Sequence, residues 1–172
     1  MKKVVVFSQI DEEILSRLQQ HYHVVVLNPK LGDINEQIRQ EVVDADVMLG
    51  AGRLLNESNL SPAQKLKIIS SVSVGYDNYD IGYLNQKKIW LANTPHVLTE
   101  TTADLAFTLL LSAARKVPFL DHWTKQGEWK RTVGPQQFGL DVFGKTLGII
   151  GLGNIGAAIA RRGFYGFNMN SV

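Results

Sequence analysis

The sequence predicts an α/β protein in which a parallel sheet is covered by helices, followed by the start of a second α/β domain. Two observations lead to this prediction. Runs rich in Val and Ile alternate with helix-like segments over residues 1–96, an order that is typical of parallel sheets. Residues 145–162, KTLGIIGLGNIGAAIARR, combine an apolar strand, a glycine-rich turn and a helix. A dinucleotide-binding unit begins with this combination.

The first domain is expected to contain five strands joined by helices. A continuous β-branched run such as KVVVFSQI is typical of a strand that is buried on both faces. The strands are expected at 3–10, 23–28, 46–51, 68–75 and 89–94. Apolar spacing predicts helices at 11–22, with Asp11 as the N-cap, and at 34–45. A shorter helix is expected at 59–67, entered at Ser61-Pro62.

A long helix is expected after the sheet. In residues 99–117 apolar side chains recur on most faces of a helix, with Thr99 as its cap, which predicts burial between two bodies. The following segment, 118–144, holds two Trp and three Phe among Gly and Pro without regular periodicity. We expect an extended arm there. It is either buried against a partner subunit or ordered as a loop on its own domain, and both interpretations stay open.

The glycine turn GLGNIG at 151–156 gains weight from its context, since a strand precedes it and a helix follows it. Gly151 would permit the tight turn, Gly153 would let a pyrophosphate approach the backbone, and Gly156 would let helix and strand pack closely. The free N–H groups of the helix would face the phosphates. The alternative is a glycine-rich connection that serves packing alone.

The composition excludes several classes of function. The net charge is +2, from 18 basic and 16 acidic residues mixed along the chain, so we expect no nucleic-acid partner. There is no cysteine, which excludes disulfides and thiolate chemistry, and no metal site is expected. The apolar run at the N-terminus is too short for a signal peptide. No stretch approaches the roughly 18 apolar residues of a membrane span, and we expect a cytoplasmic protein.

No residue is assigned to catalysis. His96 follows Asn-Thr-Pro at the expected end of a strand, where a single histidine is more often structural. His21, His23 and His122 have no carboxylate partner at a readable spacing. Arg115 ends the long helix, where a cation suits the helix dipole without any catalytic duty.

Four stretches of the chain match the motifs of one known family in order and spacing. They are SVSVGYDNYD at 71–80, NTPHVLTETTADLAFTLLLSAARKV at 93–117, GEWK at 127–130 and GKTLGIIGLGNIGAAIARRGFYGFNM at 144–169. On these residues the chain resembles the D-isomer-specific 2-hydroxyacid dehydrogenases, most closely their glyoxylate/hydroxypyruvate reductase B (2-ketogluconate reductase) branch. The resemblance covers the chain up to Met169, about the first half of a family member.

The resemblance implies two domains and a reaction. Residues 1–98 would form a flavodoxin-like substrate domain. Residues 99–172 would form an interdomain helix, a dimer arm and the first part of a truncated Rossmann domain. The intact protein would reduce glyoxylate, hydroxypyruvate or a related 2-oxoacid to the D-2-hydroxyacid with NAD or NADP as cofactor. It would form a homodimer through residues 118–143.

The resemblance also places a substrate-binding turn after the fourth strand. Backbone amides of Val74 and Gly75 would hold the carboxylate of the 2-oxoacid, and a turn with a permissive glycine can present such N–H groups to an anion. The alternative is a turn kept for its geometry alone, with Asp77 and Asn78 making local bonds.

The implied cofactor site lies later in the chain. Thr102 matches a position beside the nicotinamide, although it would also suit the first turn of a helix without a ligand. The glycine turn would bind the pyrophosphate through Gly151, Gly153, Asn154, Ile155 and Gly156. The family often has arginine where this chain has Asn154, a departure that leaves the backbone contacts in place.

The resemblance places the catalytic arginine, glutamate and histidine in the later half of the nucleotide domain, at positions beyond this sequence. We therefore expect a fragment that is inactive alone. Residues 168–172 show no helix stop or strand pattern, and the strand at 146–150 would lack neighbours, so 144–172 is expected to be mobile or paired with another chain. Two other interpretations stay open: a nucleotide-binding or dimerising module, like corepressors of this fold, and a nonfunctional remnant.

Overall fold

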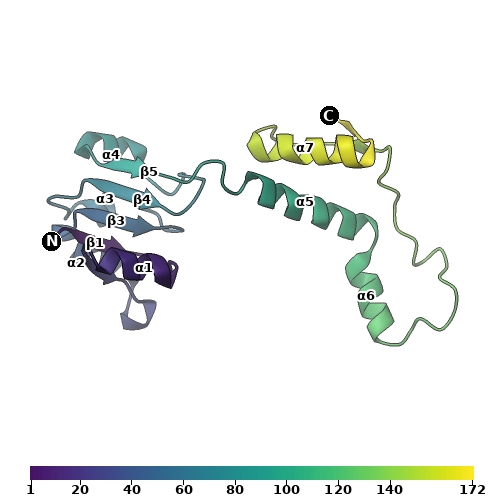
Figure 1. Ribbon diagram of the computed structural model, residues 1–172, viewed down its shortest axis with the longest axis horizontal. Helices are drawn as coiled ribbons and strands as arrows, with labels where there is room; N and C mark the ends of the chain where they lie inside the picture. Colours follow the sequence, from purple (N-terminus) through teal and green to yellow (C-terminus); the bar gives the residue numbers. More distant parts are fainter. The chain divides into compact units, whose positions relative to one another are not determined.

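The computed structural model describes residues 1–172, which divide into two compact units (Figure 1). Unit 1 comprises Met1–Pro95 and unit 2 comprises His96–Val172. None of the helices combines the length and apolar character needed to cross a membrane.

Unit 1 is built on a sheet of five parallel strands, which confirms the predicted α/β fold. The strands are β1 (Lys3–Val6), β2 (His23–Val26), β3 (Val47–Gly50), β4 (Ile68–Ser71) and β5 (Trp90–Ala92). Their order in the sheet is β2-β1-β3-β4-β5, the order of flavodoxin-like folds. Each strand is shorter than expected. Loops at the carboxyl ends of the strands therefore contain residues that the sequence assigned to strands.

The helices of unit 1 are α1 (Glu12–Gln19), α2 (Ile34–Glu41), α3 (Glu57–Leu60) and α4 (Ile81–Lys87), with single 3₁₀ turns at Pro29–Leu31 and Val42–Asp44. The Asp11 cap of α1 is confirmed, because its carboxylate accepts a hydrogen bond of 2.8 Å from the Glu13 amide.

The helix expected at 59–67 is wrong. Helix α3 begins earlier, at Glu57, and the side chains of Asn56 and Asn59 cap its first turn reciprocally. It ends before Pro62, which has no N–H to continue the helical hydrogen bonds.

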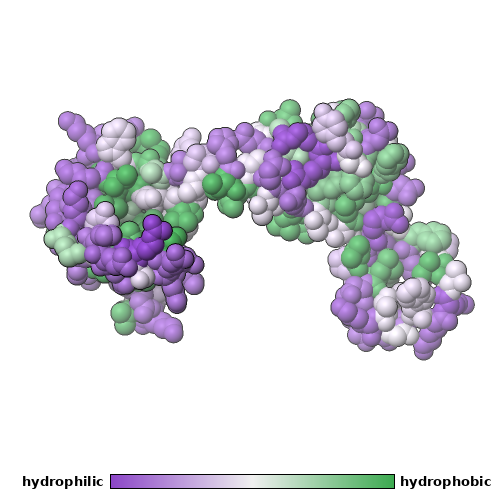
Figure 2. All heavy atoms as spheres, in the orientation of Figure 1, coloured by the Kyte–Doolittle hydropathy of each residue, from purple (hydrophilic) through white to green (hydrophobic).

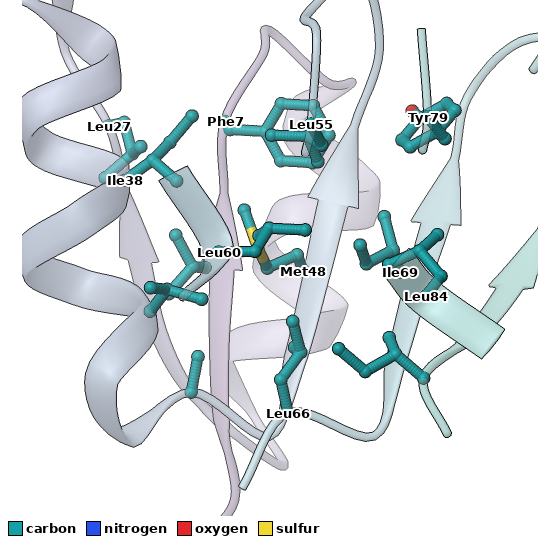
Figure 3. Packing of buried hydrophobic residues seen from close by; sticks show 14 of the residues in the cluster. Phe7, Leu27, Ile38, Met48, Leu55, Leu60, Leu66, Ile69, Tyr79 and Leu84 are labelled. Atoms are coloured by element: carbon teal, nitrogen blue, oxygen red, sulfur yellow. The ribbon is translucent and has the colours of Figure 1, made fainter. Parts of the chain in front are cut away.

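The sheet of unit 1 is covered on both faces. Successive residues of a strand point to opposite faces, and Val4, Val5 and Val6 of β1 are all buried. Helices α1 and α2 lie on opposite faces of the sheet (Figures 1 and 3). Figure 3 shows Met48 and Ile69 of the central strands packed among leucines that come from the helices and loops.

Unit 2 consists of α5 (Thr99–Ala114), α6 (Val117–Lys125), β6 (Thr146–Leu147), α7 (Asn154–Phe167) and β7 (Asn170–Ser171). Strands β6 and β7 are parallel and are joined by α7. A small core gathers between α5 and α7, with Phe107, Val142, Leu147 and Met169 buried together. The sequence between Lys145 and Val172 thus completes a minimal β-α-β unit.

The cap expected for the long helix is wrong. The residue before the first turn of α5 is Leu98, without any side-chain cap, and Thr99 is already helical. Within unit 2, Ala103 and Phe107 of α5 are buried and Leu105 is 59% exposed, and burial of α5 between two bodies stays a prediction. Within unit 2, α5 packs against α7 through one apolar side.

The arm expected at 118–144 is in part helical, because α6 occupies Val117–Lys125. Pro118 lies in its first turn, where a missing N–H costs nothing. Lys116, with a φ of 55°, takes the left-handed conformation that separates α5 from α6. The sequence did not predict this helix, because its aromatic residues obscure the helical periodicity.

The expectation that residues 168–172 lack a helix stop and a strand is also wrong. Asn168 ends α7 in the left-handed conformation, with a φ of 50°, a role that Asn fills well. Asn170 and Ser171 then pair with Thr146 and Leu147, so β6 has a neighbour. A strand of two residues is too short to leave a pattern in the sequence.

Candidate functional site

The loop that follows β4, residues 72–80, has its carbonyl groups tied back to unit 1. The Ser73 carbonyl accepts a hydrogen bond of 2.9 Å from the Thr94 amide. The Val74 carbonyl accepts one of 2.8 Å from the Asn93 side chain. The Gly75 carbonyl accepts one of 2.8 Å from the Ser73 hydroxyl. Three successive peptide planes are therefore fixed from the carbonyl side.

Fixing a peptide by its carbonyl orients its N–H in the opposite direction, because the two groups are antiparallel in a planar trans peptide. The N–H groups on these three planes belong to Val74, Gly75 and Tyr76. No protein group accepts a hydrogen bond from any of them, and all three residues are exposed. The loop thus presents a run of free donors to solvent, the arrangement that binds anions.

A chain of hydroxyl groups connects this loop to the core. The buried Tyr79 hydroxyl donates to Ser71 Oγ at 2.9 Å, and Ser71 Oγ lies 2.6 Å from Ser73 Oγ. The Ser73 hydroxyl donates its own proton to the Gly75 carbonyl. Since each hydroxyl has one proton, the proton between the serines must come from Ser71. All three hydrogen bonds therefore run in one direction, from Tyr79 to Gly75.

The residues that shape the loop are not the ones that the geometry-only interpretation named. The side chains of Asp77 and Asn78 make no hydrogen bond within the protein, although the Asn78 carbonyl accepts one of 2.8 Å from the Leu55 amide. The side chains of Ser73 and Asn93 hold the loop instead. Sequence reasoning missed both, because Asn93 lies on another strand end that only the folded sheet brings to this loop.

The three glycines in the glycine turn of unit 2 differ in backbone conformation and in packing. Gly151 has a φ of 95°, a conformation that favours glycine. A Cβ on Gly156 would collide with the Gly151 carbonyl, so helix and turn pack more closely than any other residue allows. The conformational roles expected for these two glycines are confirmed. A Cβ on Gly153 would meet nothing within 4 Å, and its φ of −78° suits any residue.

The first turn of α7 leaves its donors free. Gly153 is the N-cap and offers no side-chain acceptor, and the amides of Asn154, Ile155 and Gly156 find no acceptor elsewhere. These orphan N–H groups stand at the positive end of the helix dipole. Residues 151–155 are exposed. The turn therefore has free donors and open space beside Gly153, and no packing within the chain demands a glycine at 153.

His96 lies near this turn, whereas Thr102 contacts only its own helix. The side-chain nitrogen Nδ2 of Asn154 is 3.3 Å from His96 Nδ1, and His96 has a left-handed φ of 69°. Thr102 is exposed in the first turn of α5, and its amide donates to the Leu98 carbonyl at 2.9 Å. The sequence favours a structural role for His96, and no pattern in it indicates the pairing with Asn154.

An ion-pair network fixes α5 to α7. The guanidinium of Arg162 donates to the carboxylates of Asp104 and Glu100 and to the carbonyls of Glu100 and Ala158. Hydrogen bonds to Asp104 first, and then to Glu100, hold the pKa of Arg162 above its ordinary value. Arg161 adds one exposed ion pair to Glu100 at 2.8 Å. The network holds the first turns of α5 against the helix that starts at the glycine turn.

The expected site residues fall into two groups, one in each unit. Val74 and Gly75 belong to unit 1, whereas Thr102 and the glycine turn belong to unit 2. The four histidines make no ion pair with a carboxylate. The described residues thus supply free backbone N–H groups, and they supply no histidine–carboxylate pair.

Comparison with known proteins decides the family. The model of the D-isomer specific 2-hydroxyacid dehydrogenase catalytic domain matches residues 4–168. The chain belongs to this family. The resemblance seen in the motifs is therefore confirmed.

Curated relatives in this family are named glyoxylate/hydroxypyruvate reductase B. The one from Escherichia coli K12 is 42% identical over 169 residues, and the one from Citrobacter koseri is 41% identical over 166 residues. Each match covers 96% of this chain and 51% of the relative. The chain thus spans about half the length of the curated 2-hydroxyacid dehydrogenases that it matches.

Solved structures agree with this assignment. A protein from Thermus thermophilus superposes with a TM-score of 0.83 and 31% identity, covering 98% of this chain and 54% of that chain. The NADPH-dependent glyoxylate/hydroxypyruvate reductase from Sinorhizobium meliloti, in complex with NADP and malonate, gives a TM-score of 0.79 and 31% identity. That match covers 99% of this chain and 52% of that chain.

Proposed function

We propose that the chain contributes the substrate-carboxylate site and the cofactor-diphosphate site of an NAD(P)-dependent 2-hydroxyacid dehydrogenase. The intact protein would reduce glyoxylate, hydroxypyruvate or a related small 2-oxoacid to the D-2-hydroxyacid. Its relatives named glyoxylate/hydroxypyruvate reductase B support this substrate class. The choice between NAD and NADP stays open, although a solved relative carries NADP.

The observation that carries the proposal is the anchored loop after β4. The Ser73 and Val74 carbonyls are held by the Thr94 amide and the Asn93 side chain, so the Val74 and Gly75 amides are free and fixed in direction. A carboxylate accepts hydrogen bonds from such donors more strongly than a neutral group does. The loop is thereby suited to bind the carboxylate and to orient the neighbouring ketone carbon.

The cofactor site rests on the glycine turn. The free amides of Asn154, Ile155 and Gly156 would donate to the diphosphate, and the open space at Gly153 would admit it. Asn154 could add its side-chain amide if it releases His96. When bound, the nicotinamide supplies the hydride. Thr102, exposed on the first turn of α5, is proposed to lie beside that ring.

We further propose that the described residues bind both ligands without turnover. Reduction of a 2-oxoacid needs a cation to polarise the ketone and an acid to protonate its oxygen as charge develops. The histidines here have no carboxylate partner, an observation that supports this proposal. The alternative of a nucleotide-binding module without catalysis is favoured by no separate observation.

Nuclear magnetic resonance of the chain tests both halves of the proposal. Glyoxylate should shift the amide resonances of Val74 and Gly75, and NADH or NADPH should shift those of Asn154 and Ile155. An assay with glyoxylate and either cofactor should show no turnover by this chain. Amide shifts confined to other regions would contradict the site assignment, and turnover comparable to a full-length reductase would contradict the proposed inactivity.

A second copy of the chain is the proposed partner of residues 118–143. Phe119, Trp129, Phe138 and Phe143 are between 52% and 69% exposed, and hydrophobic residues lie at the surface around α6 (Figure 2). Burial of exposed aromatic side chains is a common source of interface stability. Sedimentation equilibrium should show a dimer that Trp129→Ser weakens. The cytoplasmic location, and the lack of nucleic-acid and membrane partners, remain expectations from the sequence.

A further inference from the structure

The buried end of the hydroxyl chain, at Tyr79, is not needed to orient the Val74 and Gly75 amides. Val74 and Gly75 receive their orientation from the Thr94 amide and the Asn93 side chain. The chain of hydroxyls acts on a different peptide, because Ser73 Oγ donates to the Gly75 carbonyl. The N–H of that peptide belongs to Tyr76. Three side chains thus act together to fix one amide that has no protein acceptor.

The start of this chain is held rigidly. Tyr79 is 5% exposed and packs in the core of unit 1, and Figure 3 shows it beside the strand that ends in the loop. Its backbone is fixed on both sides, because Leu55 donates to the Asn78 carbonyl and accepts from the Asp80 amide, at 2.8 and 3.0 Å. Ser71 is 1% exposed. A buried hydroxyl that forms no hydrogen bond is costly, so these groups hold their partners tightly.

The single direction of the three hydrogen bonds matters for an anion. In a chain of hydroxyls each donor is polarised by the one before it. The last proton, from Ser73, draws electron density toward the Gly75 carbonyl oxygen and leaves the Tyr76 N–H a stronger donor. An anion that accepts from Tyr76 therefore gains from a group three hydrogen bonds away in the core.

We infer that the Tyr76 amide is a third donor to the carboxylate of the 2-oxoacid, and that Tyr79 is its positioning residue, acting through Ser71 and Ser73. The inference rests on the proposed carboxylate site and adds a binding group and a remote determinant of affinity to it. Tyr79 itself touches no ligand.

The test compares two buried tyrosines of the same core. Tyr79→Phe removes the first hydroxyl of the chain. Tyr83→Phe is the matched control, because Tyr83 is 7% exposed in the same cluster and its hydroxyl makes no hydrogen bond within the protein. Glyoxylate is titrated into each variant, with amide resonances followed by nuclear magnetic resonance well below the unfolding temperature.

Tyr79→Phe should weaken glyoxylate binding about threefold to tenfold, as expected for one net hydrogen bond, and should reduce the shift of the Tyr76 amide most. Tyr83→Phe should leave both unchanged. Ser73→Ala should reproduce the loss, and Ser73→Thr, which keeps a hydroxyl, should restore binding. Loss of thermal stability without loss of affinity in Tyr79→Phe would overturn the inference.

The outcomes separate this inference from the proposed function. If the parent chain shows no glyoxylate-induced shift at Val74 and Gly75, the carboxylate site fails and the inference fails with it. If those amides shift while Tyr76 does not, the site is supported and the third donor is overturned. If Tyr79→Phe fails to fold, Ser73→Ala and Ser73→Thr give the same comparison from the exposed end of the chain.

Discussion

The Cβ position of Gly156 lies against the carbonyl group of Gly151. This contact joins the start of the glycine turn to the first turn of α7, and only a hydrogen atom fits between them. Gly153, in the same turn, has no such neighbour. One motif therefore contains a glycine required by packing and a glycine required by nothing within the chain.

Substitution of these two glycines should separate stability from cofactor binding. Gly156→Ala should destabilise unit 2 by about 1–3 kcal/mol, because the added methyl group forces the helix and the turn apart. Gly153→Ala should change the stability by less than about 1 kcal/mol, since its backbone already suits alanine. It should nonetheless reduce NADH affinity, because the methyl group enters the space proposed for the diphosphate. Urea denaturation and NADH titration of both variants measure the contrast, and equal stability losses would contradict it.

The ion-pair network between α5 and α7 should depend on one of its two arginines. Arg162 donates to two carboxylates and two carbonyls with a side chain that is 24% exposed. Arg161 makes one ion pair and is 55% exposed, and such pairs contribute little in water. Arg162→Gln should therefore unfold at a lower urea concentration than the parent chain. Arg161→Gln should unfold close to it, and the reverse ranking would show that the network is not as described.

Two carboxylates near the amino terminus of β1 should make the free energy of unfolding depend on pH. A backbone hydrogen bond of 2.8 Å from Lys3 lowers the pKa of Asp46, and the Lys3 ammonium group lowers the pKa of Asp44. Because these folded-state pKa values lie below the ordinary value of 3.8, the carboxylates stabilise the fold above that pH. Their contribution is lost as the pH falls through the lowered values.

Urea denaturation of the chain should therefore show stability falling below about pH 4. Asp46→Asn should be less stable than the parent chain at pH 7 and should lose less on acidification. Lys3 behaves in the opposite sense: desolvation lowers its pKa, but hydrogen bonds and charge from Asp44 and Glu41 raise it overall. Its contribution should persist up to its ordinary pKa of 10.5 and be lost at higher pH. An acid limb that is unchanged in Asp46→Asn would contradict the assignment.

The Asn93 side chain should matter for ligand binding, although it lies outside the proposed glyoxylate site and is only half-buried. Asn93→Ala removes the hydrogen bond to the Val74 carbonyl, which frees the peptide that carries the Gly75 amide. Glyoxylate binding should weaken about threefold to tenfold, the value of one net hydrogen bond. Asn85→Ala is the control, because Asn85 is exposed on α4 and its side chain makes no hydrogen bond in the protein. Equal affinities in both variants would contradict the role of Asn93.

The sheet, the glycine turn and the family could be predicted from the sequence because each leaves a local pattern. Continuous β-branched runs mark buried parallel strands, and Gly151, Gly153 and Gly156 keep a fixed spacing between a strand and a helix. Helix α6 and strand β7 were missed, since aromatic residues obscure the periodicity of the first and two residues give no pattern for the second.

The anchors of the 72–80 loop could not be predicted for a different reason. Asn93 and Thr94 meet Ser73 and Val74 only because β5 pairs with β4. The sequence pattern predicts a parallel sheet without indicating which side chain meets which carbonyl. The hydroxyl chain from Tyr79 also depends on a loop that returns to the core. Contacts of this kind come from tertiary packing, which a single sequence does not display.

Strand β5 ends the sheet, and no strand pairs with its outer edge. Trp90, at its start, is 77% exposed. The unpaired backbone groups of an edge strand, beside a large hydrophobic side chain, can pair with a strand of another chain, and such pairing leads to aggregation. Three residues offer few backbone groups for such an addition, so the brevity of this strand is itself a protection against unwanted assembly.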